Sequence, residues 1–414
     1  MLKRKNYWLL FAVLLLALTS LSPSMELDTA EGDYPPRQPQ RLSEQPDSGD
    51  KNNVTSLNIR VSMSSVELKA LQRISSNFTL STGIQVFITN VDNEENAAML
   101  KTELATMESP DIIMTDGRNI ADLATRGYLL PVDVYQSVPG SVPLTVLIPQ
   151  MQWNGYNWGI PLDIDPYVLV YSPQRLAELG FAKLPESLEE WSGLLNQLRG
   201  QQEQEEEPGT EKYLLAMDSR NAYGFSALLE SMGLSMTGDY TSALDWIQVA
   251  CSSFYLSSRF NTELWDMLQS GKLALAVLPL SEWQKNGNAS LSVKAPAKSG
   301  TIYEAMQSRF FALPAGSANP ETAVTWLAYI TSATAQLEWL ENTNRLPALE
   351  ELYNPAQPEI AGLPFDTNLL IAEEDVTAQP DGLSWDAVSD AVTLLLTGKL
   401  DAAGYTAAMG LDSE

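Results

Sequence analysis

Three aspartates of the sequence stand where a carboxylate could meet a bound ligand. Asp163 and Asp165 are two residues apart in an apolar run, so their side chains share one face of a strand. The predicted strand Pro110–Met114 runs into Asp116. A pair of carboxylates can hydrolyse a glycoside, but only adjacency suggests Asp163 and Asp165 for that role. Since nothing else in the chain builds an acid–base pair or a metal cage, we expect no enzyme activity, no metal and no cofactor.

Composition narrows the possible chemistry further. The 414 residues contain no histidine, which excludes Ser-His-Asp catalysis, Cys-His catalysis and histidine-ligated zinc. The one cysteine, Cys251, cannot form an intrachain disulfide, and its neighbours indicate a packed thiol. The net charge of −27 argues against nucleic acid as a partner, because phosphates require a basic surface.

The N-terminus has the order of segments that is typical of a secretory signal. Basic residues at 3–5 precede the apolar run Tyr7–Leu18, and small residues follow as far as Ser24. The run is shorter than the ~20 residues that comfortably span a bilayer. Residues 1–24 are therefore a cleaved signal peptide or an uncleaved signal anchor. The polar, proline-rich segment 25–54 is predicted to be a disordered tether.

Beyond residue 55, apolar periodicity predicts strands that alternate with helices. Leu57–Val61 is a strand, and Ser64 to Glu67 forms a capping box for the next helix. A second capping box is predicted at Ser187–Glu190, and Asn319-Pro320 is predicted to begin one long helix through Leu337. This alternation indicates a parallel, doubly wound α/β sheet. Ligands of such sheets bind at the carboxyl ends of strands.

Nine short stretches, in this order over residues 57–409, carry a resemblance to a known family. They are Asn77–Val86, Ser109–Asp116, Gly127–Asp133, Asn154–Pro173, Leu184–Trp191, Gly271–Trp283, Phe310–Ile330, Asn344–Ala348 and Val392–Lys399. The chain resembles the extracellular solute-binding proteins of carbohydrate ABC importers, the maltose-binding-protein-like superfamily.

The resemblance implies a periplasmic-binding-protein-like fold of type II. Two doubly wound lobes would be joined by hinge crossovers and would close around a ligand. Lobe one would hold residues 55–162 plus 312–362, and lobe two residues 166–308 plus 366–410. The implied partners are a small molecule, expected to be a carbohydrate, and an ABC permease in the membrane. We expect an exported monomer, and not a lipoprotein, because no cysteine precedes Cys251.

The same resemblance indicates residues that would contact the ligand. Sugars are bound by aromatic faces and by carboxylates or amides. The candidates are Asp165, Asp163, Asp116, Trp283, Tyr223, Phe225, Ser64, Ser65, Tyr167, Trp158 and Arg345. Each has a structural alternative. The aspartates could be hydrated hinge groups or a helix cap, the serines are explained by the capping box, and the aromatics could be core residues.

Three functions remain open from the sequence. The first is a binding protein that delivers a sugar to a permease. The second is a binding protein for another solute, or a sensor for a membrane receptor. The third, an enzyme, has the least support.

Overall fold

The structure is a computed structural model that describes residues 56–91, 100, 102–135, 138, 141–203, 212–220, 222–257, 260–296, 304–354, 358–371 and 384–411. The predicted signal segment (1–24) and tether (25–54) lie outside these residues. Within the described ranges, no helix combines the length and the apolar character needed to cross a membrane.

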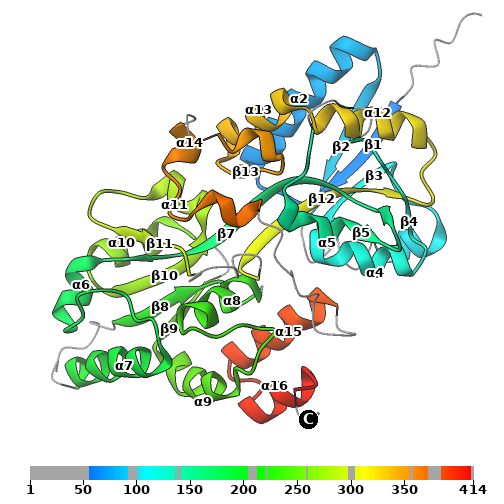
Figure 1. Cartoon of the computed structure of the whole chain (residues 1–414). Helices are drawn as coiled ribbons and strands as arrows, with labels where there is room; N and C mark the ends of the chain where they lie inside the picture. The colour runs from blue at the N-terminus through cyan, green and yellow to red at the C-terminus, as the bar shows by residue number, and fades with distance from the viewer. Residues whose placement is uncertain are drawn as a thin grey trace, which may run out of the picture. The chain divides into compact units, whose positions relative to one another are not determined.

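Most strands of the fold belong to one sheet of 11 strands (Figure 1). The strands are β1 (Ser56–Val61), β2 (Gln85–Asn90), β3 (Ile112–Asp116), β4 (Leu129–Leu130), β7 (Ile160–Tyr171), β8 (Tyr213–Met217), β9 (Phe254–Leu256), β10 (Leu273–Pro279), β11 (Ser292–Lys294), β12 (Met306–Pro314) and β13 (Leu346–Pro347). A separate hairpin is formed by β5 (Gln152–Trp153) and β6 (Tyr156–Asn157).

The main path of the sheet runs β2-β1-β3-β12-β7-β10-β8-β9. Pairing is parallel within β2-β1-β3 and within β10-β8-β9, as predicted for a doubly wound fold. The pairs β3–β12, β12–β7 and β7–β10 between these two groups are antiparallel. Two parallel sheets are thus joined through β12 and β7.

Strand β7 has a different neighbour in each half, which makes it a crossing segment. Residues Ile160–Pro166 pair with β12, and Tyr167–Tyr171 pair with β10. We call the part of the fold around β1, β2 and β3 the first lobe, and the part around β8, β9 and β10 the second lobe. In Figure 1, β7 and β12 both run from one lobe to the other.

The helices cover both faces of the sheet in each lobe (Figure 1). They are α2 (Ser65–Thr82), α4 (Ile120–Thr125), α5 (Ile148–Met151), α6 (Pro173–Glu178), α7 (Leu188–Gln202), α8 (Ala222–Ser231), α9 (Thr241–Ala250), α10 (Thr262–Gln269), α11 (Leu280–Asn286), α12 (Pro320–Ile330), α13 (Ala333–Thr343), α14 (Pro358–Ala361), α15 (Trp385–Leu396) and α16 (Ala402–Ala408). Single 3-10 turns are η1 (Gly117–Asn119), η2 (Thr145–Leu147), η3 (Cys251–Ser253), η4 (Glu350–Leu352) and η5 (Thr367–Leu370).

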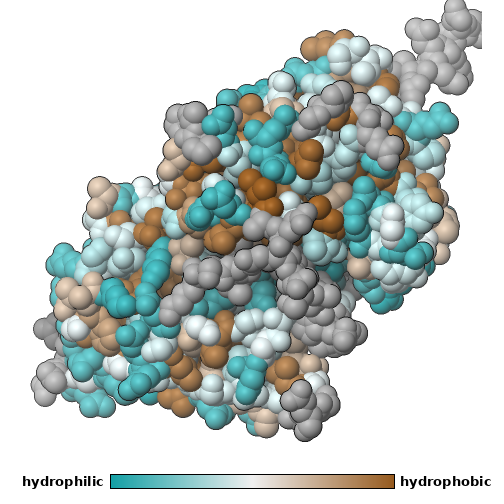
Figure 2. Space-filling model, viewed as in Figure 1, coloured by the Kyte–Doolittle hydropathy of each residue, from teal (hydrophilic) through white to brown (hydrophobic). Residues whose placement is uncertain are grey.

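Alternating side chains divide the buried residues into three apolar clusters. One cluster packs α2, α12 and α13 against one face of the first lobe's sheet. A second packs α7, α8, α9, α15 and α16 against one face of the second lobe's sheet. The third fills the remaining face of both lobes and includes α4 and α10. On the surface face shown in Figure 2, hydrophilic residues are interspersed with smaller apolar areas.

Two helix starts show what the predicted capping motifs do. Ser64 and Glu67 form the complete capping box of α2, and Gly83 ends that helix with a φ of 77°. The second predicted capping box, at Ser187–Glu190, forms only one of its two hydrogen bonds. Ser187 accepts from the Glu190 amide, but the Glu190 carboxylate accepts from the amide of Glu186 instead of that of Ser187.

The long helix predicted from Asn319-Pro320 through Leu337 is also wrong, because two helices occupy this stretch. Helix α12 ends at Ile330, and Ser332 then caps α13 by accepting from the Ala335 amide at 3.3 Å. Pro320 is at the start of α12 as predicted, but the Asn319 side chain makes no cap hydrogen bond. The amide of Asn319 donates instead to Asp111 at 2.9 Å, so a residue distant in sequence fixes this helix start.

Candidate functional site

The buried segment where β7 crosses between the lobes carries two carboxylates and meets two arginines. Asp163 and Asp165 are 0% and 1% exposed. Arg309 of β12 donates to both oxygens of Asp163. Arg345, just before β13, reaches Asp163 at 3.1 Å and Asp165 at 2.9 Å. We call these residues, together with Glu67, the hinge charge cluster.

Glu67 enters this cluster from the first turn of α2. Its carboxylate lies 2.9 Å from Arg309 and also caps the helix through the Ser64 amide. Burial raises the pKa of Glu67, but the charges of Arg309 and Arg345 and the hydrogen bonds with Ser64 outweigh that effect and lower it to about 2. A carboxylate that the sequence explained as a helix cap therefore also belongs to an ionic network.

Both central aspartates are saturated by protein donors. The Oδ2 atom of Asp163 also accepts from the Trp339 indole at 2.8 Å. Asp165 accepts from the amide and the hydroxyl of Ser281, at 3.0 and 2.6 Å. Burial raises the pKa of Asp165 against the charge of Arg345 and these hydrogen bonds. A ligand could reach either carboxylate only by displacing partners that the chain already supplies.

A second polar group lies at the carboxyl end of β3 and connects the two lobes. Asp116 accepts from the Arg118 amide at 3.0 Å, which starts η1, and from the Tyr223 hydroxyl at 2.7 Å. Burial raises the pKa of Asp116 to about 6, against the hydrogen bonds from Arg118 and Tyr223. We call Asp116, Arg118, Tyr223 and Trp385 the lobe junction.

A glycine holds the first-lobe side of the junction in place. A Cβ atom on Gly117 would lie 2.1 Å from Oε1 of Gln150 and 2.6 Å from Oγ of Ser308. Only a residue without a side chain fits this close approach. The packing therefore fixes where Asp116 and Arg118 emerge from the sheet.

Arg118 extends from η1 onto aromatic rings of the second lobe. Its guanidinium carbon is 4.1 Å from the ring centroid of Trp385 and 5.4 Å from that of Tyr223. Its Nη2 donates to the carbonyl of Glu304 at 3.2 Å. The next residue, Asn119, donates to Asp386 at 3.3 Å. Several contacts of different kinds thus join the lobes here.

The aromatic rings of the junction come from three second-lobe elements. Tyr223 is at the start of α8, and its ring is 4.8 Å from that of Trp385. Tyr167 of β7 stacks on Tyr223 at 6.1 Å with an interplanar angle of 23°. Trp385 is the first residue of α15, which Ser384 caps by accepting from the Ala387 amide.

Sequence reasoning did not identify Arg118 or Trp385 as site residues. Arg118 follows Asp116 by two residues, so the rule that ligands meet strand ends could have found it. The signal for Trp385 is weaker. It is an aromatic residue directly after a serine that can cap a helix, and only the folded chain brings it to the end of β3.

The other sequence candidates lie in different surroundings. Phe225 is fully buried in the core of the second lobe, among the residues of α8 and α9. Ser64 and Ser65 are exposed at the start of α2. Trp158 is half-buried beside the β5–β6 hairpin, 5.7 Å from the ring of Trp153. Trp283 is half-buried on α11, two residues after Ser281, and packs against the shared core.

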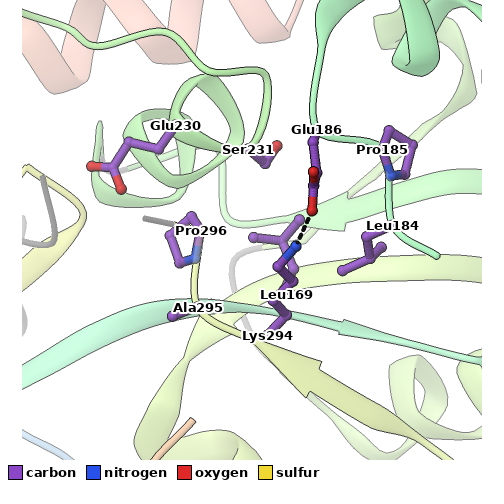
Figure 3. Close-up of a pocket in the computed structure, with 9 residues that line it drawn as sticks. All are labelled: Leu169, Leu184, Pro185, Glu186, Glu230, Ser231, Lys294, Ala295 and Pro296. Atoms are coloured by element: carbon purple, nitrogen blue, oxygen red, sulfur yellow. Dashed lines mark hydrogen bonds and ion pairs between the residues drawn. The ribbon is translucent and has the colours of Figure 1, made fainter. Parts of the chain in front are cut away.

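A pocket lies on the second lobe (Figure 3). It is lined by Leu169, Leu184, Pro185, Glu186, Glu230, Ser231, Lys294, Ala295 and Pro296. Lys294 and Glu186 form an ion pair of 2.7 Å across it. Burial and the charge of Glu304 raise the pKa of Glu230 well above its ordinary value, against the charge of Arg118. The described residues hold no cluster of three metal-ligating side chains.

Comparisons with known proteins agree with this architecture. Residues 74–364 match the family described as bacterial extracellular solute-binding protein. No curated protein matches the sequence.

Three solved structures show the same fold at low sequence identity. The GacH receptor of Streptomyces glaucescens, studied with acarbose, is 19% identical with a TM-score of 0.62, over 86% of this chain and 97% of that one. Maltose-bound MalE3 of T. maritima is 16% identical with a TM-score of 0.64, over 86% and 98%. The sugar-binding protein MalE of Xanthomonas citri is 14% identical with a TM-score of 0.62, over 86% and 96%.

The family match covers more than half of the chain, and the two-lobed α/β fold agrees with it. The chain therefore belongs to the family of bacterial extracellular solute-binding proteins.

Proposed function

We propose that this protein is the substrate-binding component of an ABC importer and that it captures a sugar between its lobes. The observation that carries the proposal is the lobe junction, where the rings of Tyr223 and Trp385 lie 4.8 Å apart and the Tyr223 hydroxyl donates to the carboxylate of Asp116. Stacking faces beside a hydrogen-bonding carboxylate are what sugar recognition needs. Relatives of the same fold were studied with acarbose and maltose, which supports this ligand class.

The lobe boundaries and the closing motion belong to the same proposal. Lobe one comprises residues 55–162 plus 312–362, and lobe two residues 166–308 plus 366–410. The pairing of β7 first with β12 and then with β10 supports a crossover near Pro166. Ligand binding closes the lobes about β7 and β12.

The proposed ligand contacts are a subset of the sequence candidates with one residue added. Asp116 and Tyr223 remain, and Trp385 joins them. Tyr167 supports the Tyr223 ring from behind, whereas Asp163, Asp165 and Arg345 act within the hinge charge cluster. We further propose that the protein works as an exported monomer beside a membrane permease and catalyses no reaction.

Calorimetry of the purified full chain against maltose, maltotriose, galactose and mannitol tests the ligand class. We expect at least one sugar to bind, and Trp385→Leu to weaken that binding by about tenfold through loss of a stacking face. Trp153→Leu, on the exposed β5–β6 hairpin, is the matched control and should leave the affinity unchanged. Failure of every carbohydrate to bind would refute a sugar as the ligand, although it would leave the fold and the family in place.

A further inference from the structure

The aromatic platform proposed to receive a sugar is already covered by a side chain of this chain. Trp385 is 5% exposed and Tyr223 is 1% exposed. The guanidinium of Arg118 lies over both rings, and Tyr167 stacks on Tyr223. A sugar and a guanidinium would need the same ring surface, because both bind to the π face. The described arrangement therefore offers a ligand little of this platform.

Arg118 is held in this place by more than the rings. It is 6% exposed, and its Nη2 donates to the Glu304 carbonyl. The buried carboxylates of Asp116 and Glu230 both interact electrostatically with its charge. A cation that is desolvated between aromatic faces and carboxylates is bound considerably more strongly than one at the surface.

The contact between Arg118 and the two rings joins the lobes, because its partners lie on different lobes. Arg118 belongs to the first lobe, directly after β3, whereas Tyr223, Trp385 and Glu304 belong to the second. The contact that covers the platform therefore also ties the two lobes together, with the Asn119–Asp386 hydrogen bond beside it. Opening the lobes and uncovering the rings require the same side chain to leave.

We propose that Arg118 is an internal gate, which occupies the platform of Tyr223 and Trp385 in the ligand-free protein and must be displaced before a sugar can stack there. This inference rests on the proposed function and adds to it a residue that sets the affinity. The free energy that holds Arg118 in place is subtracted from that of ligand binding, because the binding-competent form is only a fraction of the population.

Arg118→Ala removes the gate, and calorimetry with a sugar that binds the wild-type protein measures the effect. We expect the variant to bind that sugar more tightly by about 10- to 30-fold, the equivalent of a desolvated cation–π contact. The matched control is Arg126→Ala, an exposed arginine at the end of α4 whose pair with Asp122 is local. An affinity that stays within twofold of wild type, or falls, would overturn the proposal, since Arg118 would then be a bystander or a ligand contact.

A second measurement does not depend on any sugar. Small-angle scattering of the ligand-free proteins should give a larger radius of gyration for Arg118→Ala than for wild type or Arg126→Ala, because the tie between the lobes is lost. If no sugar binds any of the proteins, the sugar hypothesis fails, and scattering alone judges the gate: an increase supports it and an unchanged radius overturns it.

Discussion

The hinge charge cluster and the lobe junction both bury charged groups between segments of different lobes, but they balance those charges differently. In the hinge cluster, two arginines, Arg309 and Arg345, face three carboxylates and contact every one of them. At the junction, the guanidinium of Arg118 lies near the carboxylates of Asp116 and Glu230 and contacts an aromatic ring and a carbonyl.

One carboxylate of each region illustrates the difference, because the pKa values of Glu67 and Asp116 are shifted in opposite directions. The pKa of Glu67 in the hinge cluster is lowered to about 2, because two nearby cations outweigh its burial. The pKa of Asp116 at the junction is raised to about 6, because burial outweighs its hydrogen bonds and the charge of Arg118. A network in which every buried charge has a partner favours one fixed geometry. A network in which burial outweighs the stabilising charges and hydrogen bonds gains more from rearranging. We therefore expect the hinge charge cluster to be rigid and the lobe junction to rearrange more readily.

The largest effect should follow from removing a carboxylate of the hinge cluster. Asp163→Ala removes the buried carboxylate shared by Arg309, Arg345 and the Trp339 indole and leaves two arginines against two carboxylates, so the free energy of unfolding should fall by about 3–5 kcal/mol. Urea unfolding followed by tryptophan fluorescence measures it. Asp122→Ala is the control, because its ion pair with Arg126 is exposed and should contribute less than about 1 kcal/mol. A loss below about 1 kcal/mol for Asp163→Ala would remove the distinction between the two regions.

The pH dependence of stability should have opposite signs for Glu67 of the hinge charge cluster and Asp116 of the lobe junction. Between pH about 2 and 4.5, the unfolded chain binds a proton that folded Glu67 does not, so stability should rise with pH. Between pH about 4 and 6, folded Asp116 keeps a proton that the unfolded chain has released, so stability should fall as pH rises. Each contribution is at most about 3 kcal/mol.

Denaturant unfolding across pH 2–7 provides the measurement. Glu67→Gln should flatten the rise at low pH, and Asp116→Asn should flatten the fall that follows. If Asp116→Asn leaves the fall unchanged, the decrease comes from other buried acids whose pKa values are also raised, Asp165 and Glu230.

The smallest expected change in stability is at the lobe junction. Tyr223→Phe removes the hydrogen bond to Asp116 but keeps the ring, so it should cost about 1 kcal/mol. It should also move the fall in stability to higher pH, because the hydroxyl helps to stabilise the charged carboxylate. Tyr156→Phe, with an exposed side chain, is the control. An unshifted profile for Tyr223→Phe would mean that the hydroxyl does not act on Asp116.

Local motifs predicted the fold where their partners lie within a few residues. The Ser64–Glu67 capping box formed as predicted, because it depends only on neighbouring backbone groups. The break between α12 and α13 was missed. Apolar spacing continues across Thr331 and Ser332, and it does not reveal that Ser332 caps a new helix.

The candidate site was predicted in part for the same reason. Strand-end positions pointed to Asp116, and Tyr223 came from the resemblance, whereas Arg118 and Trp385 are 267 residues apart in sequence and meet only in the folded chain. Asp163 and Asp165 were predicted as ligand contacts, but the sequence did not reveal their arginine partners, which come from β12 and from the segment before β13.

An acidic, histidine-free composition, alternating strands and helices, and the order of short motifs were enough to predict an α/β protein of a solute-binding family. Apolar periodicity and helix capping depend on residues that are close together in the chain, so both can be identified from the sequence. Tertiary structure alone decided which charges pair at the hinge and which side chain covers the aromatic rings. Those contacts join residues across the lobes, and their strength depends on burial that no local pattern encodes.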